Sequence, residues 1–124
     1  MKIRTGVSAT LVALLVAALS GCAAPVRAAD LVGTYADDNG LRPLVLRAGG
    51  DCSAHLLLTG SGTVTGDCRW RLRQHGGTQV RLDFHRDPDA GAYFVDLRVD
   101  GSGTGATLYE ITDPDLQQRY VLRR

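Results

Sequence analysis

Three histidines are the side chains of this sequence best suited to bind a transition metal or to transfer a proton. His55 lies among leucines, His75 lies in a Gln-His-Gly-Gly segment that is typical of a turn, and His85 ends an expected strand. A zinc site needs three or four ligands that converge on one point, and the spacing of these residues matches no such pattern. We therefore expect no metal site and no cofactor.

The acidic and hydroxyl residues show no pattern that is typical of catalysis. The Asp-Pro-Asp triplets at 87–89 and 113–115 lack the alternating oxygen donors of a calcium loop, so both are interpreted as turns. Ser61 and Ser102 lie in Gly-Ser-Gly turns, without the base and orienting group that a nucleophile needs. Glu110 is the only glutamate, and no carboxylate pair for glycoside chemistry stands out. We predict that the protein is not an enzyme.

The N-terminal segment has a charge and hydropathy pattern that is typical of an exported protein. Lys2 and Arg4 precede an apolar stretch over residues 7–19. This stretch is too short for a bilayer core, which needs about 20 apolar residues, and fits a secretory signal. It ends at Leu-Ser-Gly-Cys, residues 19–22, which resembles the lipobox of bacterial lipoproteins.

The resemblance to bacterial lipoproteins implies a chemical role for Cys22. In that family the cysteine thiol takes a diacylglyceryl group, and the bond before it is then cut. Residues 1–21 would be the signal peptide, and residues 22–30 a lipidated cysteine with a short tether. The lipid would hold the protein on the extracytoplasmic face of the cell membrane or in an outer membrane. The alternative is an ordinary signal peptide that is cut near residues 28–29.

The export signal also decides the interpretation of the other two cysteines. With Cys22 lipidated, Cys52 and Cys68 remain as a pair in an oxidising compartment, where disulfides persist. We predict a disulfide between them, across two antiparallel strands that turn near residue 60. In this register Cys52 lies opposite Cys68, and Leu56 lies opposite Val64.

Short strands and turns account for residues 31–124. We expect strands at 31–36, 41–48, 52–59, 63–73, 78–85, 92–99, 105–111 and 118–122. Pro43 demotes the second segment to an edge strand or delays its start. Strands at this spacing with Gly-rich turns predict an all-β domain, a single antiparallel meander that forms a barrel, a flattened barrel or a sandwich.

Part of this pattern resembles small lipocalin-like lipoproteins. The segments are Leu-Val-Gly-Thr-Tyr at 31–35, Cys-Arg-Trp-Arg-Leu at 68–72 and Gln-Val-Arg-Leu at 79–82. In such proteins a Gly-Thr-Tyr segment opens the first strand, and later apolar strands build the barrel wall. The resemblance implies a lipocalin-like barrel. It implies no ligand, because the turn after the second strand and the surroundings of Trp70 depart from the family pattern.

One outer sheet face is the best candidate for a binding surface. Alternate arginines on the fourth strand share that face, the fifth strand adds one more arginine with Asp83 as a partial offset, and the sixth adds an aromatic residue. The candidate surface is Arg69, Arg71, Arg73, Arg81 and Phe94. Guanidinium groups bind carboxylates and phosphates, so this face can receive an acidic protein or a polyanionic envelope glycan. The other interpretation is a solvated face with cross-strand ion pairs.

The charge balance narrows the class of partner. Two of the 14 basic residues lie in the leader, so the remaining chain carries 12 arginines against 13 acidic residues. This balance argues against nucleic acid and against a polybasic contact with a membrane. We expect a non-catalytic envelope lipoprotein that binds a protein or a small ligand. The alternative is an inhibitor of a secreted or foreign hydrolase, which would act through the loop at 86–92 or at 100–105.

Overall fold

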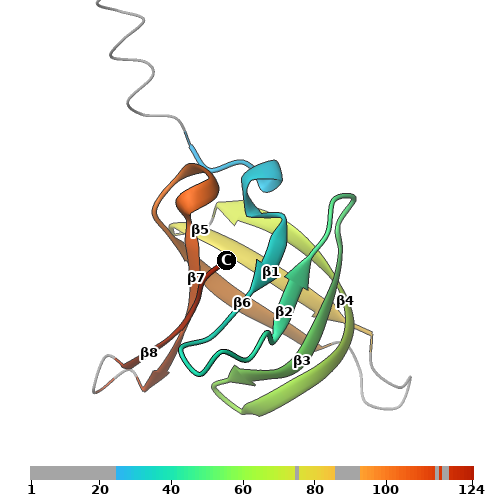
Figure 1. The fold of residues 1–124 in the computed structure, drawn as a ribbon, viewed down its shortest axis with the longest axis vertical. Coiled ribbons are helices and arrows are strands. Elements are labelled where there is room, and N and C mark those ends of the chain that lie inside the picture. The colour runs from blue at the N-terminus through green and yellow to red at the C-terminus, as the bar shows by residue number, and fades with distance from the viewer. Residues whose placement is uncertain (1–24, 75, 86–92, 114, 116–117) are drawn as a thin grey trace, which may run out of the picture.

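Eight antiparallel strands follow one another in chain order within a single sheet. The computed structural model describes residues 25–74, 76–85, 93–113, 115 and 118–124. The strands are β1 (Gly33–Tyr35), β2 (Leu44–Leu46), β3 (Asp51–Thr59), β4 (Gly62–Gln74), β5 (Thr78–Phe84), β6 (Tyr93–Asp100), β7 (Thr107–Asp113) and β8 (Gln118–Leu122). The sheet curls until it nearly closes into a barrel (Figure 1). The predicted all-β meander is confirmed.

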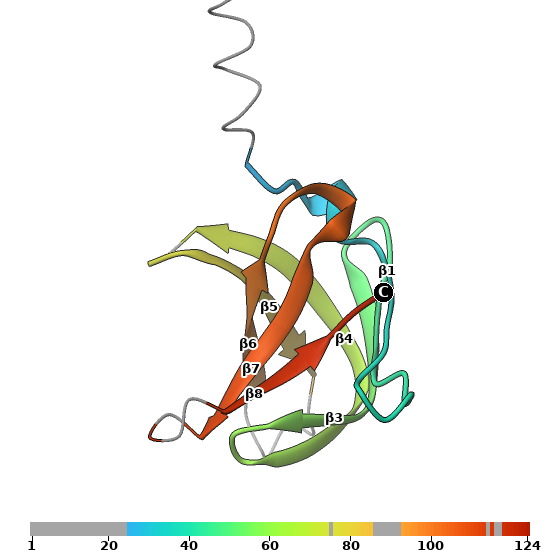
Figure 2. The ribbon, with the colours of Figure 1, turned by 60° about the vertical axis from the view of Figure 1, so that its left-hand side comes forward.

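The barrel closes through one backbone bridge and a few side chains. The Ala36 N–H donates to the Arg123 carbonyl at 2.6 Å, and the Arg123 N–H donates back at 2.9 Å. Beside this bridge, the Tyr120 hydroxyl donates to Asp37 at 3.0 Å, and Arg123 pairs with Asp38 at 2.8 Å. Figure 2 shows the C-terminus beside β1. The first and last parts of the sheet share only this one described bridge, and side-chain contacts add to it to close the barrel.

The core forms where alternate strand residues point into the barrel, as a period of two requires. On β6, for example, Val95 and Leu97 are buried, whereas Phe94 is exposed. The fully buried side chains include Leu31, Tyr35, Leu44, Leu46, Leu57, Val80, Leu82, Leu97, Leu108 and Leu122. Leu31 comes from η1, and the others come from every strand except β4. The strand β4 adds Val64, Cys68 and Trp70, which are also buried, so the whole sheet contributes to one core.

A short 3₁₀ turn, η1 (Ala28–Leu31), covers one end of the barrel. Leu31 is completely buried, and the Tyr35 hydroxyl donates to its carbonyl at 2.6 Å. A second 3₁₀ turn, η2 (Gly103–Gly105), contacts η1 at this end (Figure 1). We call it the tether end, because the chain that follows Cys22 enters the fold here. The last residues of the expected tether are thus part of the folded domain.

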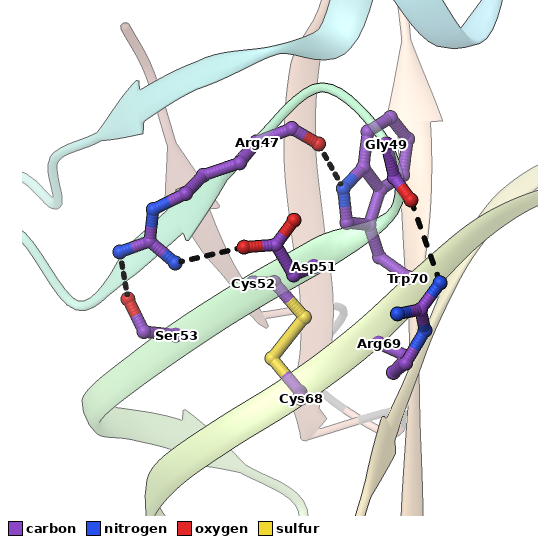
Figure 3. Close-up of polar contacts among 8 residues, drawn as sticks. All are labelled: Arg47, Gly49, Asp51, Cys52, Ser53, Cys68, Arg69 and Trp70. Carbon is purple, nitrogen blue, oxygen red and sulfur yellow. Dashed lines mark hydrogen bonds and ion pairs between the residues drawn. A yellow bond between two sulfur atoms is a disulfide. The ribbon is translucent and has the colours of Figure 1, made fainter.

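The disulfide between Cys52 and Cys68 is present, and both cysteines are buried. They face each other in the β3–β4 ladder, as predicted, with 4.8 Å between their Cα atoms. Figure 3 shows the bridge beside the turn that joins β2 to β3. The disulfide therefore fixes the start of β3 against the middle of β4.

The predicted pairing of Leu56 with Val64 is wrong, because Leu57 takes that place. A bulge between Ala54 and Leu57 shifts the register by one residue. Leu56 adopts a positive φ of 55°, and its N–H donates to the Thr65 hydroxyl at 2.9 Å. A one-residue shift exchanges the two faces of a strand. Leu57 consequently enters the core, whereas Leu56 is 51% exposed.

Pro43 acts as a delayed start for β2. The strand begins at Leu44, directly after the proline, and pairs with β1 on one side and with β3 on the other. β2 is therefore not an edge strand, and the missing N–H of the proline lies outside its ladder.

Candidate functional site

The predicted arginine face exists, and its centre is an internal ion pair. Arg81 donates to both carboxylate oxygens of Asp96, at 2.9 Å each, and Arg73 lies 4.0 Å from the same carboxylate. The hydrogen bond from Arg81 holds the pKa of Asp96 below its ordinary value. The Arg81 guanidinium also lies over the Phe94 ring, 4.0 Å from its centroid. The Arg81 guanidinium is thus already engaged by the Asp96 carboxylate and the Phe94 ring.

The two remaining arginines of this face differ in their surroundings. Arg69 donates to the Gly49 carbonyl at 3.4 Å, across to the β2–β3 turn. Arg71 lies opposite Arg81 in the β4–β5 ladder and is exposed. Among the described residues Arg71 has no hydrogen bond or ion pair. It is therefore the arginine of the predicted surface that is available to a ligand.

A groove of about 760 Å³ opens at the tether end, next to Arg71. It lies between η1, the β2–β3 turn and β4, three segments that are far apart in the sequence. Its lining is Ala28, Ala29, Val32, Ala48, Gly49, Gly50, Trp70, Arg71 and Leu72. Arg71 is the only charged residue among them. The volume falls within the range of about 300–1,000 Å³ that is usual for small-molecule sites.

Hydrogen bonds hold the β2–β3 turn in place over Trp70 (Figure 3). The indole N–H donates to the Arg47 carbonyl at 2.9 Å, and the Trp70 backbone N–H donates to Gly50 at 2.8 Å. Arg47 in turn donates to the Ser53 hydroxyl at 3.1 Å and lies 3.7 Å from Asp51. Together with the nearby disulfide, these contacts give the groove one wall that is formed before any ligand arrives.

Sequence reasoning missed this groove, although it had singled out several of its parts. Arg71 lies on the outer face of its strand, as predicted, and residues 48–50 form the turn between β2 and β3. The missing part is η1, because residues 28–30 were interpreted as tether. Two alanines and a valine carry no signal of a binding site until the fold brings them opposite a tryptophan.

Of the other predicted residues, none that the structure describes lines this groove. His55 and His85 are exposed, and His75 lies outside the described residues, as do Cys22 and the loop at 86–92. The loop at 100–105 contains η2, where the Arg124 guanidinium donates to the Thr104 carbonyl and ties the loop to the C-terminus. That contact gives the inhibitor hypothesis no support. Within the described part of the chain, no helix is long and apolar enough to cross a membrane.

The fold and the groove define the class of protein on geometric grounds: an eight-stranded meander barrel with an apolar site at its tether end. The chain matches no protein-family model, no curated protein and no solved structure.

Proposed function

We propose that the protein is a lipid-anchored extracytoplasmic binding protein, without a catalytic role, whose groove holds an acyl chain of an anionic amphiphile. The observation that carries this proposal is the groove itself, whose described lining is apolar apart from Arg71. An acyl chain fits the apolar lining, and a carboxylate or phosphate at its end fits the guanidinium.

The magnitude of apolar burial is sufficient for binding. Each methylene that leaves water contributes about 0.8 kcal/mol, so ten buried methylenes contribute about 8 kcal/mol. This gross value corresponds to a Kd of about 1 μM before the costs of association are subtracted. Because one groove wall is held by Trp70 and the β2–β3 turn, little of that energy is lost in ordering the site.

The position of the groove supports a ligand that comes from a membrane. Ala28 lines the groove and is the sixth residue after Cys22. A fully extended chain of that length spans at most about 20 Å. A lipid on Cys22 would therefore keep the groove close to the bilayer surface, where amphiphiles are concentrated.

Trp70 provides a direct test of the groove, because it is the only tryptophan and it lines the site. Residues 23–124 are titrated with dibromostearate, whose bromine atoms quench a nearby indole. We expect saturable quenching of Trp70 emission. Arg71→Ala should weaken binding about tenfold, which corresponds to about 1.4 kcal/mol. Absence of saturable quenching in the wild-type protein would overturn the proposed ligand class.

A matched control separates the role of Arg71 from general surface charge. Arg73 lies two residues away on the same face of β4 and does not line the groove. Arg73→Ala should leave dibromostearate binding unchanged. Equal losses in Arg71→Ala and Arg73→Ala would assign the effect to surface charge and would remove the specific contact to Arg71.

The lipid anchor is tested in an expressing bacterium by labelling the full chain with radioactive palmitate. The wild-type chain should carry the label and sediment with membranes. Cys22→Ser should lose both the label and the membrane association. Retention of the label in Cys22→Ser would show that the anchor lies elsewhere.

A further inference from the structure

The barrel wall has a gap between β6 and β7. Their ladder contains three pairs and ends at Arg98 and Tyr109, whereas β6 pairs with β5 as far as Tyr93. The gap lies toward the β3–β4 turn, at the opposite end of the barrel from η1 (Figure 1). Beyond this point no β6–β7 ladder joins the two strands in the described part of the chain, so side chains form the surface of the gap.

Glu110 is the next residue of β7 after the last β6–β7 pair, and its carboxylate is incompletely satisfied. The Gly60 backbone N–H hydrogen bonds to it, but Oε2 is buried and has no hydrogen-bond partner among the described residues. Burial raises the pKa of Glu110 above its ordinary value. A buried acceptor without a partner costs about 1–3 kcal/mol. A ligand that donates a hydrogen bond to Glu110 would offset this cost.

Two cavities flank this carboxylate. The larger has a volume of about 310 Å³ and lies against the β3–β4 turn, and the smaller, of about 200 Å³, lies against Arg98. Both are lined by Glu110 and Asp96. The larger cavity also presents three hydroxyl groups. The Tyr93 hydroxyl lies 3.4 Å from that of Thr59 and 3.5 Å from that of Ser61.

The charge in the larger cavity favours a cation. Among the described residues, its lining contains two carboxylates and no basic side chain. Arg98, whose charge acts to lower the pKa of Glu110, lines the smaller cavity instead. Asp96 is already bound by Arg81 through two hydrogen bonds, so Glu110 supplies the negative charge that lacks a counter-ion inside the cavity. Phe94 and Val95 supply apolar lining. A small ligand that carries a positively charged N–H donor and an apolar portion would match both the carboxylate and the apolar lining.

We propose that the larger cavity binds the primary ammonium group of a small organic amine, with Glu110 as its counter-ion. An ammonium group has three donors, and the Glu110 carboxylate and the Ser61 hydroxyl can accept from it. The Thr59 hydroxyl already donates to the Gly62 carbonyl and accepts from the Ser61 N–H. The terminal torsion of a glutamate side chain is broad, so a small rotation of Glu110 presents Oε2 to the cavity. The cavity volume is at the lower end of the usual range for small ligands.

The test uses the processed, lipid-bearing chain in lipid nanodiscs, with the backbone amide signals of Gly60 and Ser61 followed by NMR. The probes are n-butylammonium, tetramethylammonium and butanoate. We expect a saturable shift with n-butylammonium alone, because tetramethylammonium has the charge without N–H donors and butanoate has the opposite charge. Glu110→Gln should weaken n-butylammonium binding at least tenfold. The control, Asp100→Asn, removes an exposed carboxylate at the other end of β6 and should leave binding unchanged.

Several outcomes would overturn the ammonium site. These are the absence of a saturable shift, equal shifts with tetramethylammonium or butanoate, and unchanged binding in Glu110→Gln. If Glu110→Gln does not fold, the three probes on the wild-type protein decide the question without a variant. Acyl-chain binding at the tether end is measured separately through Trp70, so neither result bears on the other.

Discussion

Removal of the disulfide should cost this small barrel a large part of its stability. The perturbation is the double substitution Cys52→Ala and Cys68→Ala. The two cysteines are 16 residues apart, and both lie in the core. On the chain-entropy account, a cross-link that closes a loop of this length stabilises by about 3 kcal/mol. Small domains have total stabilities of about 5–15 kcal/mol, so the loss is a fifth to more than half of the total.

Urea unfolding followed by Trp70 fluorescence measures this loss. Trp70 is buried two residues from Cys68, so its emission changes when β4 leaves the core. For small proteins, the free energy of unfolding falls by about 1–3 kcal/mol for each 1 M of urea. The midpoint should therefore fall by about 1–3 M when the bridge is removed.

Wild-type protein under reducing conditions is the matched control for the double substitution. Reduction opens the same loop without removing the sulfur atoms from the core. In both samples the free energy of unfolding should be about 3 kcal/mol lower than in the oxidised protein. If both lose less than about 1 kcal/mol, the argument from the entropy of the unfolded chain is refuted. A loss in the double variant alone would assign the effect to core packing.

Three further substitutions test the barrel closure, the gap between β6 and β7, and the contact of Gly33 with Arg124. Burial and the hydrogen bond to Asp37 raise the pKa of Tyr120 to about 12, so wild-type stability should fall as the pH rises from 10 to 12. Tyr120→Phe should reduce that slope in urea melts at increasing pH, and the remainder comes from Tyr35, whose pKa burial also raises. Burial raises the pKa of Glu110, so its protonated form is favoured in the folded state, and stability falls as the pH rises above the ordinary carboxyl range. Glu110→Gln should therefore be more stable than wild type at pH 7 but not at pH 3; an equal difference at both values would contradict the assignment. At Gly33, φ is +154° and an added Cβ would lie 2.7 Å from Arg124 Cδ, so Gly33→Ala should lower Tm. Gly105→Ala, where nothing lies within 4 Å, should not.

The fold could be predicted from local patterns because strand periodicity is a local property. Period-two alternation along β5 and β6 puts Val80 and Leu82 on one face of β5 and Leu97 on one face of β6, and these faces are buried in the structure. The facing of Cys52 and Cys68 followed from one turn and a count of residues. The prediction went wrong at Leu56, because a bulge depends on a backbone torsion and on a hydrogen bond to Thr65 that no residue pattern announces.

The arginine face shows the limit of this reasoning for the site. Alternation correctly placed Arg71, Arg81 and Phe94 on the outer surface. It could not show that Asp96, rather than Asp83, neutralises Arg81, because that choice depends on which side chains reach across neighbouring strands. Lipidation of Cys22 stays a prediction from the leader sequence alone.

By itself, the sequence determined the all-β class, the approximate strand positions and the disulfide, since each follows from spacing along the chain. Only the tertiary structure decided where a ligand can bind. The groove joins η1, the β2–β3 turn and β4, and the wall gap brings Glu110 against the β3–β4 turn. Such sites are made by distant segments of the chain, and the contacts between those segments arise only when the barrel closes.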